Sequence, residues 1–124
     1  GTFPGDMAIE PVEITDELAT GRMVVDKRHL HPGGFVHGGV WTALADSVAA
    51  WATFRNMPPN HDFTTIELKT NFLGTTRDGA ILCEGTPAHI GRRTMVWDAR
   101  VWDEKTGRDI ALFRCTQMIL PKQQ

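Results

Sequence analysis

The chain has 124 residues, of which 41% are hydrophobic and 23% charged, and its formal net charge is −2 at pH 7. This length suits a single domain over residues 1–124 with one core, and the scattered basic residues argue against nucleic acid as the main partner. No apolar run approaches the roughly 20 residues that span a bilayer, and no signal segment opens the chain, so we expect a cytoplasmic protein without a membrane partner. Residues 1–6 are set apart as a disordered or non-native segment.

Two short strands are expected within the first 30 residues. Residues 7–17 contain an alternation that suits an edge strand, and Arg22–Lys27 predicts a second strand. Thr20-Gly21, which stands between them, is a turn signal.

Residues 31–54 combine a Gly-rich loop that carries histidines with a long apolar segment. Pro32-Gly33-Gly34 interrupts regular structure, a helix is expected over about 39–55, and Pro58-Pro59 ends it because proline lacks an amide proton. A helix that is hydrophobic on nearly every side is usually buried. Asp46 is the only charged side chain of the apolar segment, and a buried carboxylate is costly unless it is paired, hydrogen-bonded or lining a cavity. Asp46 therefore has either a structural partner or a chemical function.

The rest of the chain predicts four strands joined by tight turns. They are expected over residues 63–73, 80–90, 94–103 and 108–120. In the first of them, alternation places Ile66, Leu68, Thr70 and Phe72 on one face and Thr65 on the other.

The residues between and within these strands predict how the strands are connected. Gly85 and Pro87 predict a bulge or bend, and Glu104–Gly107 predicts a hairpin turn. Successive tight turns imply antiparallel neighbours, because a parallel crossover needs about a dozen residues or more. We therefore predict an α+β fold in which an antiparallel sheet of about six strands wraps around one long buried helix.

His37-Gly38-Gly39 stands where the helix should begin. The first N–H groups of a helix lack internal partners and lie at the positive end of its dipole, and glycine lets a ligand approach them closely. Such a site suits a phosphate, a carboxylate or the developing oxyanion of an acyl group. The alternative is that the glycines serve only the loop-to-helix turn.

Asp46 lies eight residues beyond Gly38, which is about 12 Å along a helix. A carbonyl held at Gly38 therefore cannot also touch Asp46 of the same helix. The two groups meet if two subunits pair their helices side by side and antiparallel, which predicts a symmetric dimer with two composite sites. The alternative is an Asp46 that is hydrogen-bonded to a neighbouring Thr or Ser within one chain.

The sequence HGGVWTALAD at residues 37–46, followed by TIELKTNFL at 65–73, resembles the hotdog-fold acyl-CoA thioesterases, most closely the phenylacetate-degradation and 4-hydroxybenzoyl-CoA type. The resemblance covers about residues 20–120. It implies the hotdog fold and hydrolysis of an aryl- or medium- to long-chain acyl-CoA. It also implies a homodimer with shared sites that pairs again into a tetramer, and no cofactor other than the coenzyme A of the substrate.

The same resemblance implies roles for the residues at the helix. The Gly38 N–H would polarise the thioester carbonyl, and Asp46 of the partner subunit would act as nucleophile or general base. His37 would orient the thioester and support the loop, with Gly39 in the same substrate-binding turn. Burial should raise the pKa of Asp46 and the opposing helix N-terminus should lower it, and the sequence leaves the balance open.

Further roles are implied beyond the helix. Thr65, or its neighbour Thr64, matches a position where a hydroxyl helps to place the water. His31 matches a position that usually holds Asn or Gln and contacts the carboxylate or the water. Arg92 and Arg93 lie in a turn and could meet the phosphates of coenzyme A, the alternative being a solvated turn.

Other candidate residues have structural explanations. Cys83 and Cys115 lack metal-ligand spacing and are expected to be buried thiols, with a disulfide or a metal as alternatives. His61 and His89 have no convincing partners, so no metal is assigned. The four tryptophans could line an acyl pocket, but packing in the core or between subunits is the default.

Two other functions compete with hydrolysis. The loop at His31, with an acid about fifteen residues later, is faintly similar to acyl-carrier-protein dehydratases, although those begin the helix with Pro-Gly-Val and carry Glu. A non-catalytic acyl-CoA-binding protein of the same fold is the other alternative. Release of a free thiol distinguishes hydrolysis from both.

Overall fold

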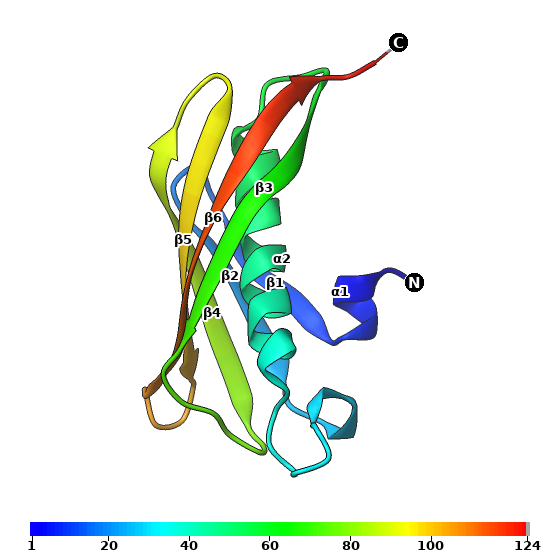
Figure 1. The fold of residues 1–124 in the computed structure, drawn as a ribbon, viewed down its shortest axis with the longest axis vertical. Coiled ribbons are helices and arrows are strands. Elements are labelled where there is room, and N and C mark those ends of the chain that lie inside the picture. Colours follow the sequence, from blue (N-terminus) through cyan, green and yellow to red (C-terminus); the bar gives the residue numbers. More distant parts are fainter. Residues whose placement is uncertain (124) are drawn as a thin grey trace.

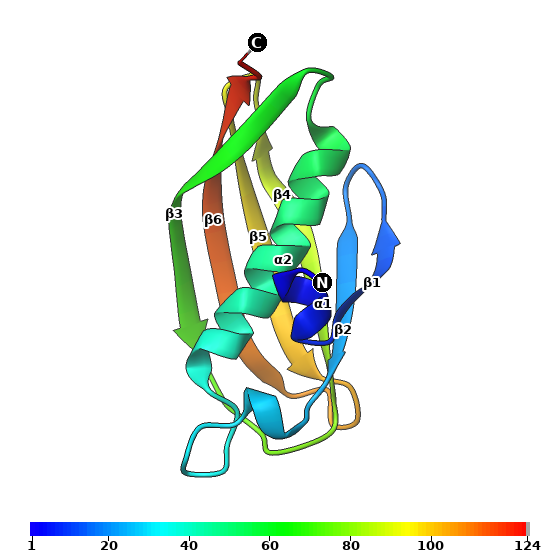
Figure 2. The same ribbon diagram turned by 90° about the vertical axis from the view of Figure 1, so that its right-hand side faces the viewer.

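The long helix α2 (Gly38–Asn56) lies diagonally across the concave face of a six-stranded antiparallel sheet in the computed structural model, which describes residues 1–123 (Figure 2). The strands are β1 (Ile9–Ile14), β2 (Ala19–Val24), β3 (His61–Phe72), β4 (Ala80–Ile90), β5 (Thr94–Asp103) and β6 (Asp109–Pro121). Their order in the sheet is β1-β2-β4-β5-β6-β3, so β1 and β3 form its edges (Figure 1). The predicted α+β architecture is confirmed.

Helix α2 is buried because its side chains are apolar on most sides. Its side chains pack against the inner face of the sheet, and those fully removed from solvent include Trp41, Leu44, Ala45, Val48, Ala49 and Ala52. The helix begins and ends one residue outside the predicted range 39–55. Within residues 1–123, no helix is both long enough and apolar enough to cross a bilayer.

Gly21 lies inside β2, and its assignment to a turn was wrong. The chain reverses between β1 and β2 at residues 15–18, where the Thr15 N–H donates to the Leu18 carbonyl at 2.7 Å. A Cβ atom on Gly21 would lie 2.9 Å from Val48 Cγ2 of α2. The glycine therefore lets the helix approach the strand closely, as does Gly85 on β4, where a Cβ would lie 3.2 Å from Val48 Cγ1.

The predicted strand Arg22–Lys27 is also corrected. Strand β2 ends at Val24, and Lys27–His29 forms a short 3-10 helix, η1. The Asp26 side chain caps η1 by accepting the Arg28 N–H at 3.0 Å. This local cap favours the turn over an extension of the strand.

The segment 1–6, expected to be disordered, contains one helical turn, α1 (Phe3–Asp6). Pro4 in its first turn has a backbone already suited to a helix start. The Asp6 N–H donates to the Thr2 carbonyl at 2.9 Å. Helix α1 lies against α2 on the side away from the sheet (Figures 1 and 2).

Strand β3 contains a bulge at Ile66 that the alternation does not reveal. Thr65 pairs with Gln117 and Glu67 with Thr116, so Ile66 is an extra residue. The bulge places Thr65 on the helix side together with Thr70, whose hydroxyl lies 2.9 Å from that of Thr42 on α2. The prediction that Thr65 and Thr70 occupy opposite faces was therefore wrong.

The predicted irregularities of the other strands are confirmed. The pairing of β4 with β5 shifts register just after Pro87. Gly107 has φ +73° and its N–H donates to the Asp103 carbonyl at 2.8 Å, which closes the β5–β6 hairpin.

Candidate active site

The start of α2 is organised by His37. Its Nδ1 accepts the Gly39 N–H at 2.9 Å, which makes His37 the N-cap of the helix. The Val40 N–H donates to the His37 carbonyl at 2.9 Å, whereas no acceptor for the Gly38 N–H is found among residues 1–123. The predicted support of the loop by His37 therefore has a direct geometric basis. The Gly38 N–H is therefore available to a ligand.

A side chain at Gly38 would face Phe72 at the end of β3. The nearest ring carbon would lie 3.5 Å from a Cβ atom on Gly38, an ordinary contact distance. A side chain would therefore fit at position 38, and the functional group of Gly38 is its backbone N–H. Gly39 is different, because its N–H is already used by His37.

Asp46 is half-buried on α2, and its Oδ1 has no hydrogen-bond partner within residues 1–123. Burial raises the pKa of this carboxyl above the ordinary value for aspartate. The nearby hydroxyls are engaged elsewhere: Ser47 donates to the Ala43 carbonyl at 2.7 Å, and Thr42 contacts Thr70. The alternative of a Ser or Thr partner in the same chain therefore fails over the described residues.

Cys115 is a buried thiol of β6 whose pKa is influenced by Asp46. Burial raises the pKa of the Cys115 thiol to about 12, and the negative charge of Asp46 adds to that effect. Both Cys115 and Cys83 are free and buried, so the prediction of two buried thiols is confirmed.

Thr65 is brought to the inner face by the bulge in β3. Its hydroxyl donates to Gln117 Oε1 at 2.6 Å, which leaves the oxygen of Thr65 as an acceptor for another group. Thr64, the alternative candidate, is exposed on the other face of the strand. The structure thus distinguishes two neighbours that the sequence treats alike.

Gln117 is a residue of this region that the sequence analysis missed. It is fully buried, and its Nε2 has no partner within residues 1–123. The available signal was the alternation Ala111, Phe113, Cys115 on β6, which continues to position 117 on the inner face. A glutamine at an inward position of such a strand indicates a buried polar contact.

His31 lies in the loop before α2, in a turn of its own. Its Nδ1 accepts the Gly33 N–H at 2.9 Å, and its carbonyl accepts the Gly34 N–H. A neutral ring in this arrangement carries its proton on Nε2 and can donate it to a substrate. No hydrogen bond joins His31 to Asp46 within residues 1–123, so its contact with the carboxylate stays a prediction.

Arg92 and Arg93 lie in the exposed turn between β4 and β5. This turn is at the opposite end of the sheet from the start of α2 (Figure 1). Within one chain the two arginines therefore do not reach Gly38. Their contact with the phosphates of coenzyme A stays a prediction.

The remaining candidates from the sequence are the possible metal ligands and the four tryptophans. Over residues 1–123, no three His, Cys, Asp or Glu side chains are placed to hold a metal ion. Trp41 and Trp97 are buried core residues, whereas Trp51 and Trp102 are half-buried.

Comparison with known proteins relates this geometry to a family. The sequence model of the thioesterase superfamily matches residues 33–110. The ComA2 protein of Bacillus subtilis (strain 168) is 36% identical over 121 residues, which are 94% of this chain and 92% of that protein. The 1,4-dihydroxy-2-naphthoyl-CoA hydrolase of Escherichia coli (strain K12) is 31% identical over 120 residues, 97% of this chain and 88% of that protein. The crystal structure of a glutamine-to-alanine mutant of thioesterase PA1618 from Pseudomonas aeruginosa has a TM-score of 0.90 at 28% identity, covering 95% of this chain and 85% of that one.

Proposed function

The chain belongs to the thioesterase superfamily and is a thioester hydrolase, and from this premise we propose that it converts an aryl- or medium- to long-chain acyl-CoA into a free acid and coenzyme A. The observation that carries the proposal is that one helix holds two polar groups without hydrogen-bond partners. The Gly38 N–H has no acceptor, and the buried Asp46 Oδ1 has no donor within residues 1–123. The naphthoyl-CoA substrate in the name of the Escherichia coli relative supports the aryl alternative.

Each site is proposed to form between two subunits. Gly38 and Asp46 are about 12 Å apart along α2, too far to act on one carbonyl. Two α2 helices packed antiparallel would bring Asp46 of the partner subunit to the start of the first helix. The same pairing would bring the arginine turn of the partner to this end, so Arg92 and Arg93 would face the phosphates of coenzyme A.

The free edge of the sheet supports this pairing. Strand β3 has a neighbour on one side only over the described residues, and it runs for 12 residues. Ile66, Leu68 and Phe72 are exposed along it, and Phe54 of α2 is exposed beside Phe63. A long apolar edge strand is an aggregation hazard unless another chain covers it. A second copy of this chain, related by a twofold axis, would cover it.

The chemistry requires only these groups. The Gly38 N–H stabilises the negative charge that develops on the carbonyl oxygen. As a general base, Asp46 takes a proton from water while the water oxygen attacks the carbonyl carbon, and the carbon–sulfur bond then breaks as the thiolate of coenzyme A leaves with a proton. As a nucleophile, Asp46 would itself attack the carbonyl carbon and expel the thiolate of coenzyme A, and water would then hydrolyse the resulting mixed anhydride to the free acid and the Asp46 carboxylate. Thr65, whose own proton is held by Gln117, would accept a hydrogen bond from the attacking water.

The experiment offers the protein a panel of acetyl-, octanoyl-, benzoyl- and 2-enoyl-CoA together with a thiol-detecting reagent. Release of free thiol is the expected result. Hydration of the 2-enoyl-CoA without thiol release would replace hydrolysis by the dehydratase alternative. Binding without any reaction would leave an acyl-CoA-binding protein.

The pH dependence of hydrolysis follows from the raised pKa of Asp46. Only the ionised carboxylate can act as base or nucleophile, so activity should be lost as the pH falls through that pKa. We expect burial to outweigh the opposing effect of the partner's helix N-terminus, so the midpoint of the acidic limb of kcat/KM should lie above the ordinary value of about 3.9. Initial rates with benzoyl-CoA at constant ionic strength test this. A profile that stays flat down to that ordinary value contradicts it.

A further inference from the structure

An apolar groove lies between the N-terminal arm, residues 3–9, and the first turns of α2. The helical turn of this arm lies on the side of α2 away from the sheet (Figure 2). Its volume is about 210 Å³. It is lined by Phe3, Met7, Ile9, His37, Gly39, Val40 and Ala43. His37 is the only one of these that can carry a charge, so the groove suits an uncharged apolar group.

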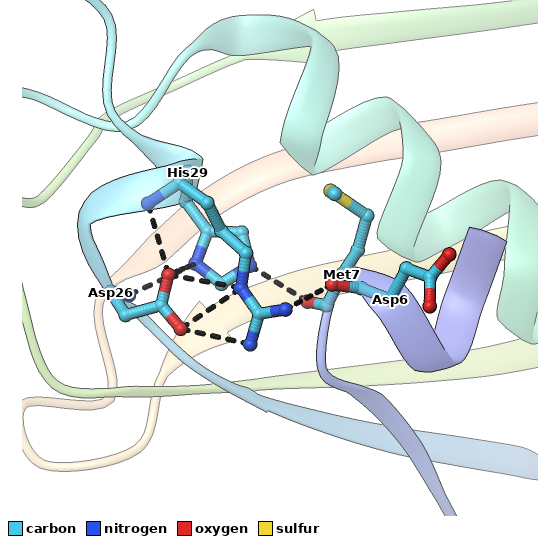
Figure 3. Close-up of polar contacts among 5 residues, drawn as sticks. Asp6, Met7, Asp26 and His29 are labelled. Atoms are coloured by element: carbon cyan, nitrogen blue, oxygen red, sulfur yellow. Dashed lines mark hydrogen bonds and ion pairs between the residues drawn. The ribbon is translucent and has the colours of Figure 1, made fainter. Parts of the chain in front are cut away.

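The arm is held in place by His29, a fully buried residue of η1 (Figure 3). Its Nε2 lies 2.7 Å from the Met7 carbonyl, and its Nδ1 accepts the Asp26 N–H at 2.9 Å. With Nδ1 as an acceptor, Nε2 carries the proton and donates it to Met7. Arg28 adds a second tie, because its guanidinium donates to the Asp6 carbonyl and to the Asp26 carboxylate.

His29 also fixes the start of α2. Its carbonyl accepts the His37 N–H at 2.9 Å, one residue before Gly38. The same residue thus ties both walls of the groove, the arm through Met7 and the helix cap through His37. The groove is therefore a built feature of the fold and not an accidental gap beside a loose terminus.

The groove lies at the start of α2, the end of the helix at which the thioester is proposed to bind. His37 and Gly39, which line it, flank the Gly38 N–H on either side in the chain. We propose that this groove holds the acyl group of the substrate, with Met7 and Phe3 of the arm limiting its length. This inference rests on the proposed function. It assigns an apolar acyl group, a hydrocarbon chain or an unsubstituted ring, as the substrate class.

The test changes the size of Met7 and compares substrates of different length. Met7→Trp should fill the groove, and kcat/KM for octanoyl-CoA should fall by about tenfold or more, because each methylene accommodated by an apolar pocket is worth about 10- to 200-fold. The rate with acetyl-CoA should stay close to that of the wild type. Met7→Ala should instead shift the preference towards longer chains. Val12→Trp, which adds the same ring at an exposed position of β1, is the matched control and should change neither rate.

A binding measurement separates this inference from the proposed function. Titration calorimetry should show that octanoyl-CoA binds the wild-type protein more tightly than coenzyme A does, and that Met7→Trp removes the difference. Equal affinities of the wild-type protein for octanoyl-CoA and coenzyme A would overturn the assignment of the groove to the acyl group, even if thioesters are hydrolysed. An equal loss of rate in Met7→Trp for every acyl length would do the same. Preserved acyl-dependent affinity without any hydrolysis would instead overturn the function and keep the groove. A Met7→Trp protein that changes oligomeric state would show that a second copy, and not the acyl group, fills it.

Discussion

Replacing Asp46 by Asn is expected to lower kcat for thioester hydrolysis by about 10²- to 10⁴-fold, the range typical of a positioned acid–base group. The substitution keeps the size of the side chain and removes the charge that must accept a proton or attack the carbonyl. Steady-state rates with benzoyl-CoA and the thiol-detecting reagent measure the loss. Asp16→Asn provides the control, because Asp16 is exposed, pairs with Arg55 at 2.9 Å and has no part in the proposed chemistry.

The loss should not come from unfolding. The pKa of Asp46 is raised in the folded chain, so the folded state holds its proton more tightly than the unfolded state does. Stability from this group is therefore present at low pH and falls as the pH rises through the interval between the unfolded and the folded pKa. At pH 7 the ionised Asp46 lowers the free energy of unfolding. Asp46→Asn should accordingly have a Tm at or above that of the wild type, and an inactive variant with a lower Tm would contradict the assignment.

Replacing Gly38 by Pro is expected to lower kcat by about 10²- to 10³-fold, because it deletes the one N–H assigned to the oxyanion. The first position of a helix is where proline is best tolerated, since that N–H has no partner in the helix. The preceding residue must be extended, and His37 already has φ −62° and ψ 134°. The substitution therefore removes the donor while leaving α2 in place, as circular dichroism and Tm should show.

Gly38→Ala is the matched control for the proline variant. It retains the N–H, and its Cβ would make an ordinary 3.5 Å contact with Phe72. We expect it to keep a rate close to that of the wild type. If alanine impairs hydrolysis as much as proline does, the loss comes from the added carbon atoms and the oxyanion role of the Gly38 N–H is wrong.

The order and type of the main elements could be predicted because hydrophobic periodicity reports them directly. The wrong predictions, at Gly21 and in the first half of β3, have their cause in contacts between segments that are distant in the sequence. Gly21 carries the usual signature of a turn, yet its lack of a side chain serves the close approach of Val48 from a helix that follows it in the chain. The bulge at Ile66 moves Thr65 to the opposite face, and the pairing with β6 that reveals it is absent from any local pattern.

The candidate site was partly predictable for a similar reason. An isolated acid in an apolar helix and the eight-residue spacing from Gly38 are both visible in the sequence, and they already require two subunits. Gln117 and His29 could not be assigned, because their importance comes from partners 52 and 22 residues away along the chain. Contacts at such separations become visible only when the fold brings them together.

The central claim is that Gly38 of one subunit acts with Asp46 of the other, and subunit mixing tests it most directly. Asp46→Asn and Gly38→Pro proteins, each inactive alone, are refolded together, and native mass spectrometry verifies that mixed dimers form. Random pairing makes half of the dimers mixed, and each mixed dimer has one intact site of two, so about one quarter of wild-type activity should return. If mixed dimers form and activity stays at the level of the separate variants, the two groups act within one chain and the shared site is wrong.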